Sequence, residues 1–307
     1  MLWGGCFCRK DVFAMFVAVN CRKKLLLYIA LFCLFALLAG GFGIHKATAS
    51  VQADAQPESG VELPIIMYHG ILKDEKRQGK YVISPDLLES DMKYLKEAGY
   101  TPVFMRDLIA YTTDGTPLPE KPIMLSFDDG YYNNYAYAFP LAKQYQMKLV
   151  LAPIIQGTEK YSEANEENPN YGHITWNNMK EMVDSGYVEI QNHSYNLHSS
   201  SQGRVGIQRA WGESEKHYET LLTQDLQMAQ TKITEYTGVA PTTFVYPFGA
   251  FSDTSEEYIR KLGFLATLTC EGRMNFITQN PECLYGLGRY LRSNETDSAT
   301  FFQKILP

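Results

Sequence analysis

The chain has 307 residues, of which 45% are hydrophobic, 20% charged and 13% aromatic, a composition typical of globular proteins rather than of disordered or collagen-like ones. Its formal net charge of -6 is unevenly divided, because residues 1–49 hold six basic residues and one acidic residue; this leaves 22 basic and 33 acidic residues, a net charge of -11, for residues 50–307. Nucleic-acid binding needs clustered lysine and arginine side chains, so this acidic body argues against a nucleic-acid partner.

The N-terminal region carries a membrane signal. Residues 25–44, LLLYIALFCLFALLAGGFGI, contain no charged residue and are long enough to cross a bilayer as a helix. The basic run 22–24 precedes them, and because positive charges stay on the cytoplasmic side, we expect residues 1–24 inside the cell and the rest of the chain outside. Residues 47–49, Ala-Thr-Ala, resemble a cleavage site, so a cleaved signal peptide and a retained anchor both fit.

Residues 45–60 are mostly small and polar, which predicts a linker before a domain over residues 61–307. Within that domain, short apolar runs alternate with amphipathic stretches. These runs are apolar on both faces, which favours parallel strands covered by helices on each side of the sheet. The candidate strands are Ile65–Tyr68, Pro102–Phe104, Ile123–Phe127, Leu149–Pro153, Tyr187–Ile190, Thr243–Tyr246 and Phe264–Leu268.

Capping residues predict the helices between these strands. The predicted helices run from Ser84 to Gly99, Thr175 to Gly186, Ser214 to Gly238 and Asp253 to Gly263. Seven strands with intervening helices suggest an α/β barrel, and a doubly wound open sheet is the alternative. Residues 156–173 and 199–213 are too long and too polar for simple connections, which predicts functional loops or surface insertions.

Two adjacent carboxylates, Asp128 and Asp129, follow the third predicted strand within the sequence Ser-Phe-Asp-Asp-Gly. Adjacent residues on a strand point to opposite sides, so one carboxylate could bind a metal while the other faces substrate and a water molecule. A surface Asp-Asp-Gly turn is the alternative interpretation.

Two histidines, His193 and His198, follow the fifth predicted strand and lie five residues apart. This spacing does not stack two side chains on one helical face, but it suits a turn that directs both imidazoles inward. Neutral imidazole is the commonest protein ligand for transition metals, and one carboxylate with two histidines is typical of a catalytic metal site. Two unrelated loop histidines are the alternative.

A Pro-aromatic-Gly turn, Pro247-Phe248-Gly249, follows the sixth predicted strand after Tyr246. Such a turn is rigid, so it could form a groove wall and direct a backbone N–H at an oxyanion. A plain turn is the alternative.

Taken together and in this order, the three clusters resemble the motifs of the polysaccharide deacetylases of carbohydrate esterase family 4, the NodB-homology family. The resemblance covers residues 61–293, and Pro64–Gly70 and Trp176 are similar to the subgroup that deacetylates poly-N-acetylglucosamine. It implies an α/β fold, a distorted (β/α)7 barrel of parallel strands, here preceded by the transmembrane or signal helix.

The resemblance also implies one divalent metal ion, usually zinc, with Asp129, His193 and His198 as ligands and Asp128 as general base. In such enzymes the metal activates a water molecule and polarises the acetamide carbonyl. The backbone N–H of Phe248 would help to hold the oxyanion.

The sequence departs from the family pattern at two places. Val245 stands where many members carry arginine, and Leu268-Thr269-Cys270 replaces the late Leu-x-His motif, whose histidine usually acts as general acid. Similarity to the poly-N-acetylglucosamine subgroup suggests His69 as the acid instead. A buried structural histidine, or a weak or inactive enzyme, is the alternative.

Arg289 could reach Asp128 and hold it ionised, or could be a surface arginine. The aromatic residues Tyr131, Trp176, Trp211, Tyr246 and Phe248 are candidate substrate-binding residues, the first three by stacking on pyranose rings.

Cys270 and Cys283 lie outside the N-terminal region. They could pair in an oxidising compartment or remain free buried thiols.

The resemblance implies a hydrolase of linear amide bonds, which we expect to be a monomer, and the N-terminal signal predicts that it lies on the extracellular face of the membrane or is secreted. It would remove N-acetyl groups from an N-acetylglucosamine polymer such as biofilm poly-N-acetylglucosamine, peptidoglycan or a chitin-like chain. The alternatives are a non-catalytic carbohydrate-binding pseudoenzyme, and an O-acetyl xylan esterase or peptidoglycan amidase on the same fold. The absence of a Gly-x-Ser-x-Gly elbow disfavours a serine esterase.

Overall fold

The computed structural model describes residues 60–201 and 203–307. The expected cytoplasmic segment, the signal or anchor helix and nearly all of the linker fall on residues 1–59, outside the described residues. None of the helices in the described part of the chain combines the length and the apolar character needed to cross a bilayer.

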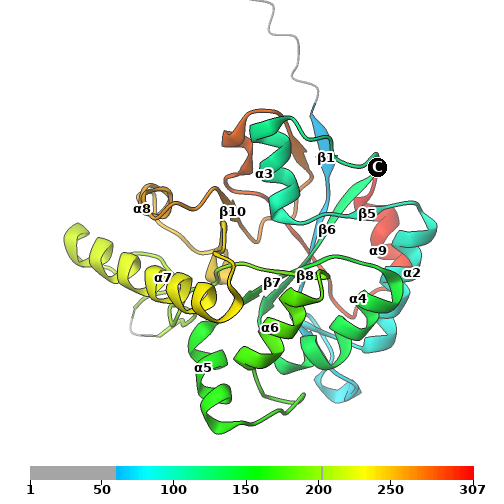
Figure 1. Cartoon of the computed structure of the whole chain (residues 1–307), viewed down its shortest axis with the longest axis horizontal. Coiled ribbons are helices and arrows are strands. Elements are labelled where there is room, and N and C mark those ends of the chain that lie inside the picture. The colour runs from blue at the N-terminus through cyan, green and yellow to red at the C-terminus, as the bar shows by residue number, and fades with distance from the viewer. Residues whose placement is uncertain (1–59, 202) are drawn as a thin grey trace, which may run out of the picture. The chain divides into compact units, whose positions relative to one another are not determined.

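A parallel sheet runs through the middle of the domain (Figure 1). Its strands, in spatial order, are β12 (Tyr290–Leu291), β2 (Ile65–Tyr68), β6 (Pro122–Asp129), β7 (Leu149–Pro153) and β8 (Val188–Ile190), and β5 (Thr101–Pro102) also pairs with β6. All eight residues of β6 are buried, as expected for a parallel strand that is covered on both faces.

A second parallel pair, β9 (Thr243–Val245) and β10 (Ala266–Leu268), continues the arrangement. Single parallel bridges connect this pair on both sides, from Asn192 after β8 to Phe244 and from Leu268 to Leu287 before β12. The predicted α/β fold with parallel strands is therefore confirmed, whereas closure of these strands into a (β/α)7 barrel stays a prediction.

Two further pairings involve short strands. They are the antiparallel pair β1 (Val61–Leu63) and β11 (Asn275–Ile277), and the parallel pair β3 (Gly70–Ile71) and β4 (Val82–Ile83).

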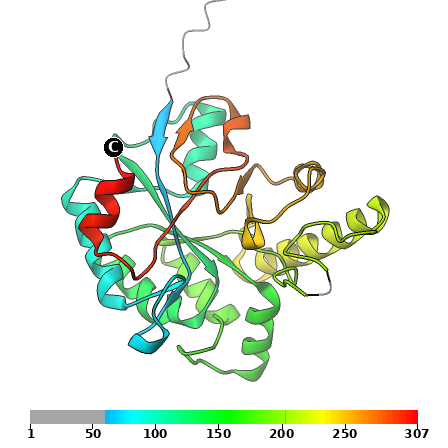
Figure 2. The same cartoon turned by 180° about the vertical axis from the view of Figure 1, so that it is seen from behind.

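Helices surround the strands in both views of the domain (Figures 1 and 2). They are α2 (Pro85–Glu97), α3 (Met105–Asp114), α4 (Phe139–Tyr145), α5 (Ile155–Ala164), α6 (Trp176–Asp184), α7 (Glu215–Thr237), α8 (Ser255–Lys261) and α9 (Ser298–Ile305). Four match the predicted helices to within a few residues. The Ser84 hydroxyl accepts the Leu87 N–H at the start of α2, and Gly238, with φ of 77°, ends α7 in the left-handed conformation.

Residues 156–173, predicted as a functional loop or surface insertion, are not a loop in their first half, where α5 forms. Ile155 and Thr158 are buried and fix this helix against the core, and Asn165 ends it in the left-handed conformation with φ of 48°. Polar composition alone misled the prediction, because a helix at the surface needs only a narrow buried stripe. Residues 199–201 and 203–213 do form a loop, and no helix or strand occurs in these described residues.

Alternation along β6 determines which side chains reach the site. Leu125 and Phe127 belong to one buried cluster, whereas Met124 belongs to a second cluster on the other face of the strand. Ser126 and Asp128 lie two and four residues after Met124 on the strand, so their side chains project from the same face as that of Met124.

Candidate metal and catalytic site

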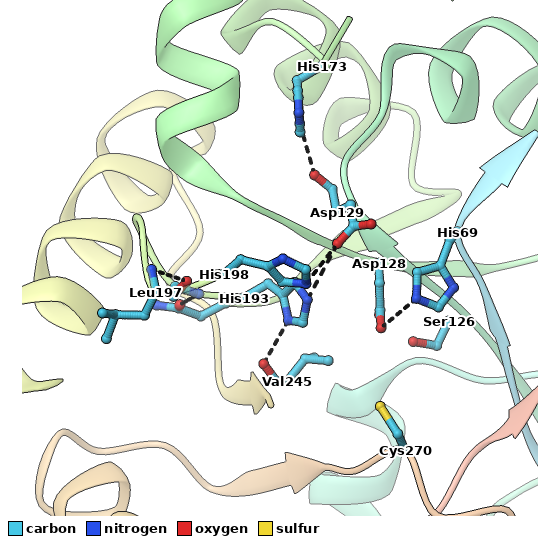
Figure 3. A network of polar contacts seen from close by, with 12 residues as sticks. His69, Ser126, Asp128, Asp129, His173, His193, Leu197, His198, Val245 and Cys270 are labelled. Carbon is cyan, nitrogen blue, oxygen red and sulfur yellow. Dashed lines mark hydrogen bonds and ion pairs between the residues drawn. The ribbon is translucent and has the colours of Figure 1, made fainter. Parts of the chain in front are cut away.

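Polar side chains meet where the parallel strands end (Figure 3). Asp128 and Asp129 end β6, His69 follows β2, and the turn with His193 and His198 follows β8. Carboxyl ends of parallel strands share one edge, which is why residues far apart in the sequence converge there. The cavity at this edge has a volume of about 490 Å³ and is lined by Met67, His69, Lys80, Tyr81, Asp128, Asp129, Tyr131, His193, His198, Phe248, Cys270 and Leu291.

Asp129, His193 and His198 form a compact group of metal-ligand type. Asp129 Oδ1 lies 3.3 Å from His198 Nε2 and 3.7 Å from His193 Nε2, and one donor atom from each residue lies within 4.8 Å of the others. His193 Nδ1 lies 2.7 Å from the Val245 carbonyl oxygen, which orients the ring so that Nε2 faces Asp129.

Two of these donor atoms, Asp129 Oδ1 and His193 Nε2, are buried and have no hydrogen-bond partner among the described residues. Such buried polar atoms are costly unless something satisfies them. A divalent cation held by one carboxylate oxygen and two imidazole nitrogens would satisfy both, so the residues present fit the expected metal.

Burial is the largest cause of the pKa shifts of these three residues. It raises the pKa of Asp129 to about 6, with a further contribution from the negative charge of Asp128. Burial also lowers the pKa of His193 to about 3 and lowers the pKa of His198. Both imidazoles are therefore neutral near pH 7, the form that binds metals.

Backbone strain at the site accompanies the positions of the metal-ligand side chains. Asp129 and Ser194 have φ of 68° and 75°, in the left-handed region that non-glycine residues avoid. Gly130 follows with φ of 70°, and a β-carbon there would lie 2.4 Å from Pro153 Cβ, so glycine is required. His173 Nδ1 lies 3.1 Å from the Asp129 carbonyl oxygen and supports this turn.

Asp128 pairs with Arg289, which lies 161 residues further along the chain and is fully buried. Arg289 Nη1 donates to Asp128 Oδ1 at 2.7 Å, and Arg289 Nη2 donates to Asp128 Oδ2 at 2.9 Å. The guanidinium also donates to Ser126 Oγ at 2.9 Å and to the Thr269 carbonyl at 2.8 Å. Burial alone would raise the pKa of Asp128, but Arg289 more than reverses this effect, so that the pKa lies well below its usual range.

His69 faces the same carboxylate from β2. Its Nε2 lies 3.9 Å from Asp128 Oδ2, and its ring packs edge-on against Tyr81 at 5.0 Å between centroids. The side chain is 16% exposed and lines the cavity.

The candidate aromatic residues separate into two groups. Phe248 and Tyr131 line the cavity, and the Phe248 ring lies 4.2 Å from the His198 ring. Tyr246 is buried against Phe244, because it continues the buried face of β9.

The two tryptophans lie elsewhere. Trp176 is buried and stacks on Tyr236 at 4.2 Å. Trp211 is 99% exposed on the 199–213 loop. The structure thus does not bring Tyr246, Trp176 or Trp211 into the cavity lining.

Cys270 and Cys283 are free thiols, so the disulfide alternative was wrong. Cys270 lines the cavity, and its sulfur lies 3.8 Å from Arg289 Nη2. Sequence reasoning singled out Cys270 as a departure from a motif and as a possible disulfide partner, and it missed Tyr81, Lys80 and His173 as neighbours of the site. No local motif marks these three, because only the fold brings them there.

The comparisons with known proteins agree with this geometry. The family model described as polysaccharide deacetylase matches residues 115–267, which include the Asp128–Asp129 and His193–His198 segments. Among solved structures, a de-N-acetylase from Aggregatibacter actinomycetemcomitans superposes with a TM-score of 0.68 and 28% sequence identity, covering 79% of this chain and 99% of that one.

Two curated relatives carry the name poly-beta-1,6-N-acetyl-D-glucosamine N-deacetylase. The protein of Escherichia coli K12 is 27% identical over 261 residues, which cover 78% of this chain and 38% of the relative. The protein of Staphylococcus aureus N315 is 26% identical over 184 residues, which cover 60% of this chain and 59% of the relative. The chain thus spans well under half of the E. coli relative's length.

Proposed function

Because the chain belongs to the polysaccharide deacetylase family, we propose that it hydrolyses N-acetyl groups from an extracellular N-acetylglucosamine polymer in a metal-dependent reaction. Poly-β-1,6-N-acetylglucosamine is the proposed polymer, since two relatives are named for it. The observation that carries the proposal is the cavity in which Asp129, His193 and His198 offer three ligand atoms beside an ionised, arginine-held Asp128.

The proposed metal is one divalent cation such as Zn²⁺, with Asp129, His193 and His198 as its ligands. When bound, it would supply Lewis-acid polarisation of the acetamide carbonyl and a lowered pKa for water.

The chain's own residues would handle the protons. Asp128, kept ionised by Arg289, accepts a proton from the attacking water at a carboxylate oxygen. His69, whose Nε2 lies 3.9 Å from Asp128 Oδ2, would donate a proton to the sugar nitrogen as the carbon–nitrogen bond breaks. The backbone N–H of Phe248, on the turn beside His198, would donate to the oxyanion. The products are acetate and a free amine on the sugar.

The proposed location is the extracellular face of the membrane, or the medium if the signal is cleaved, and the proposed state is a monomer. The location rests on the apolar run 25–44 and the basic residues before it.

Acetate release tests the proposal. The purified chain is assayed on poly-β-1,6-N-acetylglucosamine, chitooligomers, peptidoglycan and acetylated xylan, with and without a chelator. We expect chelator-sensitive release from the β-1,6-linked polymer that returns when zinc is added back. Release from xylan alone would favour the esterase, and no chelator-sensitive release from any substrate would favour the pseudoenzyme.

His69→Ala should lower kcat by about 100-fold or more, because general acids contribute on the order of 10² to 10⁴. Metal content should stay unchanged, since His69 is not one of the three ligands. The two measurements are initial rates of acetate release and metal per chain by elemental analysis. Unchanged kcat would remove His69 from the mechanism.

Trp211→Ala should raise KM for long polymers by about 2- to 12-fold, the value of one aromatic stacking contact. The loop carrying Trp211 packs on the segment that follows the turn of Phe248, since Arg209 N donates to Ser252 Oγ at 2.9 Å. Within the loop, Arg204 pairs with Glu213 at 2.5 Å. A 99% exposed indole on a loop that packs next to this segment suits contact with sugar units beyond the reacting one.

KM for a disaccharide should not change in this variant. Phe276→Ala is the matched control, because Phe276 is 59% exposed but lies on β11 beside Pro122, at the opposite end of β6. Equal KM increases for short and long substrates, or no increase in either, would exclude the proposed contact.

A further inference from the structure

The carboxylate of Asp225, on α7, accepts two hydrogen bonds from the turn that carries both histidine ligands. Asp225 Oδ1 accepts the Tyr195 N–H at 2.8 Å, and Asp225 Oδ2 accepts the Asn196 N–H at 2.9 Å. Both N–H groups lie between His193 and His198 in the sequence. A single side chain on a long helix therefore holds the middle of the turn through its backbone.

The turn needs such support because its conformation is unfavourable. Ser194 has φ of 75°, and strained residues persist only where their surroundings fix them. Asn192 and Ser194 provide local hydrogen bonds: Asn192 Oδ1 accepts the Ser194 N–H at 2.9 Å, and Ser194 Oγ accepts the Leu197 N–H at 3.0 Å. These bonds lie within the turn, whereas two other helices hold it from outside. Asp225 on α7 accepts two of the turn's N–H groups, and the turn's Ser194 and Tyr195 carbonyl oxygens accept the Ile155 and Gln156 N–H groups of α5 at 3.3 and 2.9 Å.

Asp225 is not needed for the packing of α7 itself. Tyr218, Leu222, Leu226 and Ile233 bury the apolar face of the helix, and Ser214 caps its start. Among the described residues, no lysine or arginine forms an ion pair with Asp225. Asp225 is half-buried, which raises its pKa to about 6, and the two backbone N–H groups are what stabilise its charge.

We propose that Asp225 is a positioning residue, which holds the His193–His198 turn in its metal-binding conformation before the cation arrives. The inference rests on the proposed metal site. Outer-shell partners of metal ligands typically contribute a factor of 10 to 100 in metal affinity. Asp225 would contribute through the backbone of the turn rather than by contact with an imidazole.

Cobalt binding tests this inference. The metal-free chain is titrated with Co²⁺, and the dissociation constant is read from the visible absorption of the bound ion. Asp225→Ala should raise this constant about 10- to 100-fold. Asp225→Asn should give an intermediate value, because its one carbonyl oxygen replaces one acceptor while its NH₂ group opposes the second N–H.

Glu159→Gln is the matched control. Glu159 also contacts Tyr195, but only through the phenol, which donates to Glu159 Oε2 at 2.6 Å, and Glu159 Oε1 pairs with Lys232 at 2.5 Å. This substitution should leave the cobalt dissociation constant unchanged.

The outcomes separate the inference from the function on which it rests. Wild-type binding with unchanged affinity in both Asp225 variants would overturn the inference alone, as would equal weakening in Glu159→Gln. A wild-type chain that binds no cobalt would overturn the metal site and the inference together. A graded loss from Asp to Asn to Ala, with the Glu159→Gln control unaffected, would support it even if the Ala variant were poorly folded.

Discussion

Asp128→Asn should lower kcat for acetate release by about 100- to 10,000-fold while the metal content of the chain stays the same. The amide keeps the size of the carboxylate but cannot accept the proton of the attacking water. Arg289 binds both oxygens of Asp128 and holds its pKa well below the usual range, so the carboxylate is ionised and carries no proton of its own when the water attacks. The measurements are kcat on the polymer and metal per chain.

A second buried pair separates catalysis from stability in this experiment. Arg292 donates from Nε to Asp91 Oδ2 at 2.8 Å and from Nη2 to Asp91 Oδ1 at 2.9 Å, and both side chains are fully buried away from the cavity lining. Asp91→Asn weakens a similar ion pair, so it should reduce the free energy of unfolding without reducing kcat per folded molecule. Equal loss of kcat in the two variants would show that Asp128 matters only for folding.

His198→Ala should lose the bound metal and lower acetate release about 1,000-fold or more, because the metal contributes several kcal/mol of transition-state stabilisation and each 1.36 kcal/mol is tenfold in rate. His198 is the most exposed of the three ligands, with 19% of its side chain accessible, so its removal should disturb the fold least. Metal analysis and initial rates measure the two effects.

His217→Ala provides the control for losing a histidine. His217 is exposed on α7 and pairs with Glu213 at 2.7 Å, outside the cavity lining. Metal content and rate should both stay at the wild-type value in this variant. Full metal content in His198→Ala would mean that the cation, if bound, lies elsewhere.

The sequence predicted best where function and structure are encoded locally. The strands Ile65–Tyr68 and Leu149–Pro153 appear with the predicted bounds, because continuous apolar runs are what a strand covered on both faces requires. Asp128, Asp129, His193 and His198 sit at strand ends in short motifs, so parallel strand direction alone places them at one edge.

Prediction was weaker where the environment depends on distant segments. Residue type identified Tyr246 and Trp176 as substrate-binding candidates, but burial of an aromatic ring is decided by the face of the element on which it lies, and both rings face the protein interior. Cys270 reaches the cavity because β10 ends beside the site, in agreement with its position where the family pattern has the late Leu-x-His motif.

Arg289 shows an intermediate case. Its pairing with Asp128 was one of two interpretations, and the fold decides between them by placing it against β6, next to Ser126.

Anomalous X-ray diffraction at the zinc absorption edge, from crystals of the zinc-loaded chain, tests the central claim most directly. The account predicts one strong peak at ligand distance, about 2.0–2.2 Å, from an oxygen of Asp129 and from Nε2 of both His193 and His198, with Asp128 still bound to Arg289. No peak in the cavity, or a peak coordinated by other residues, would contradict it.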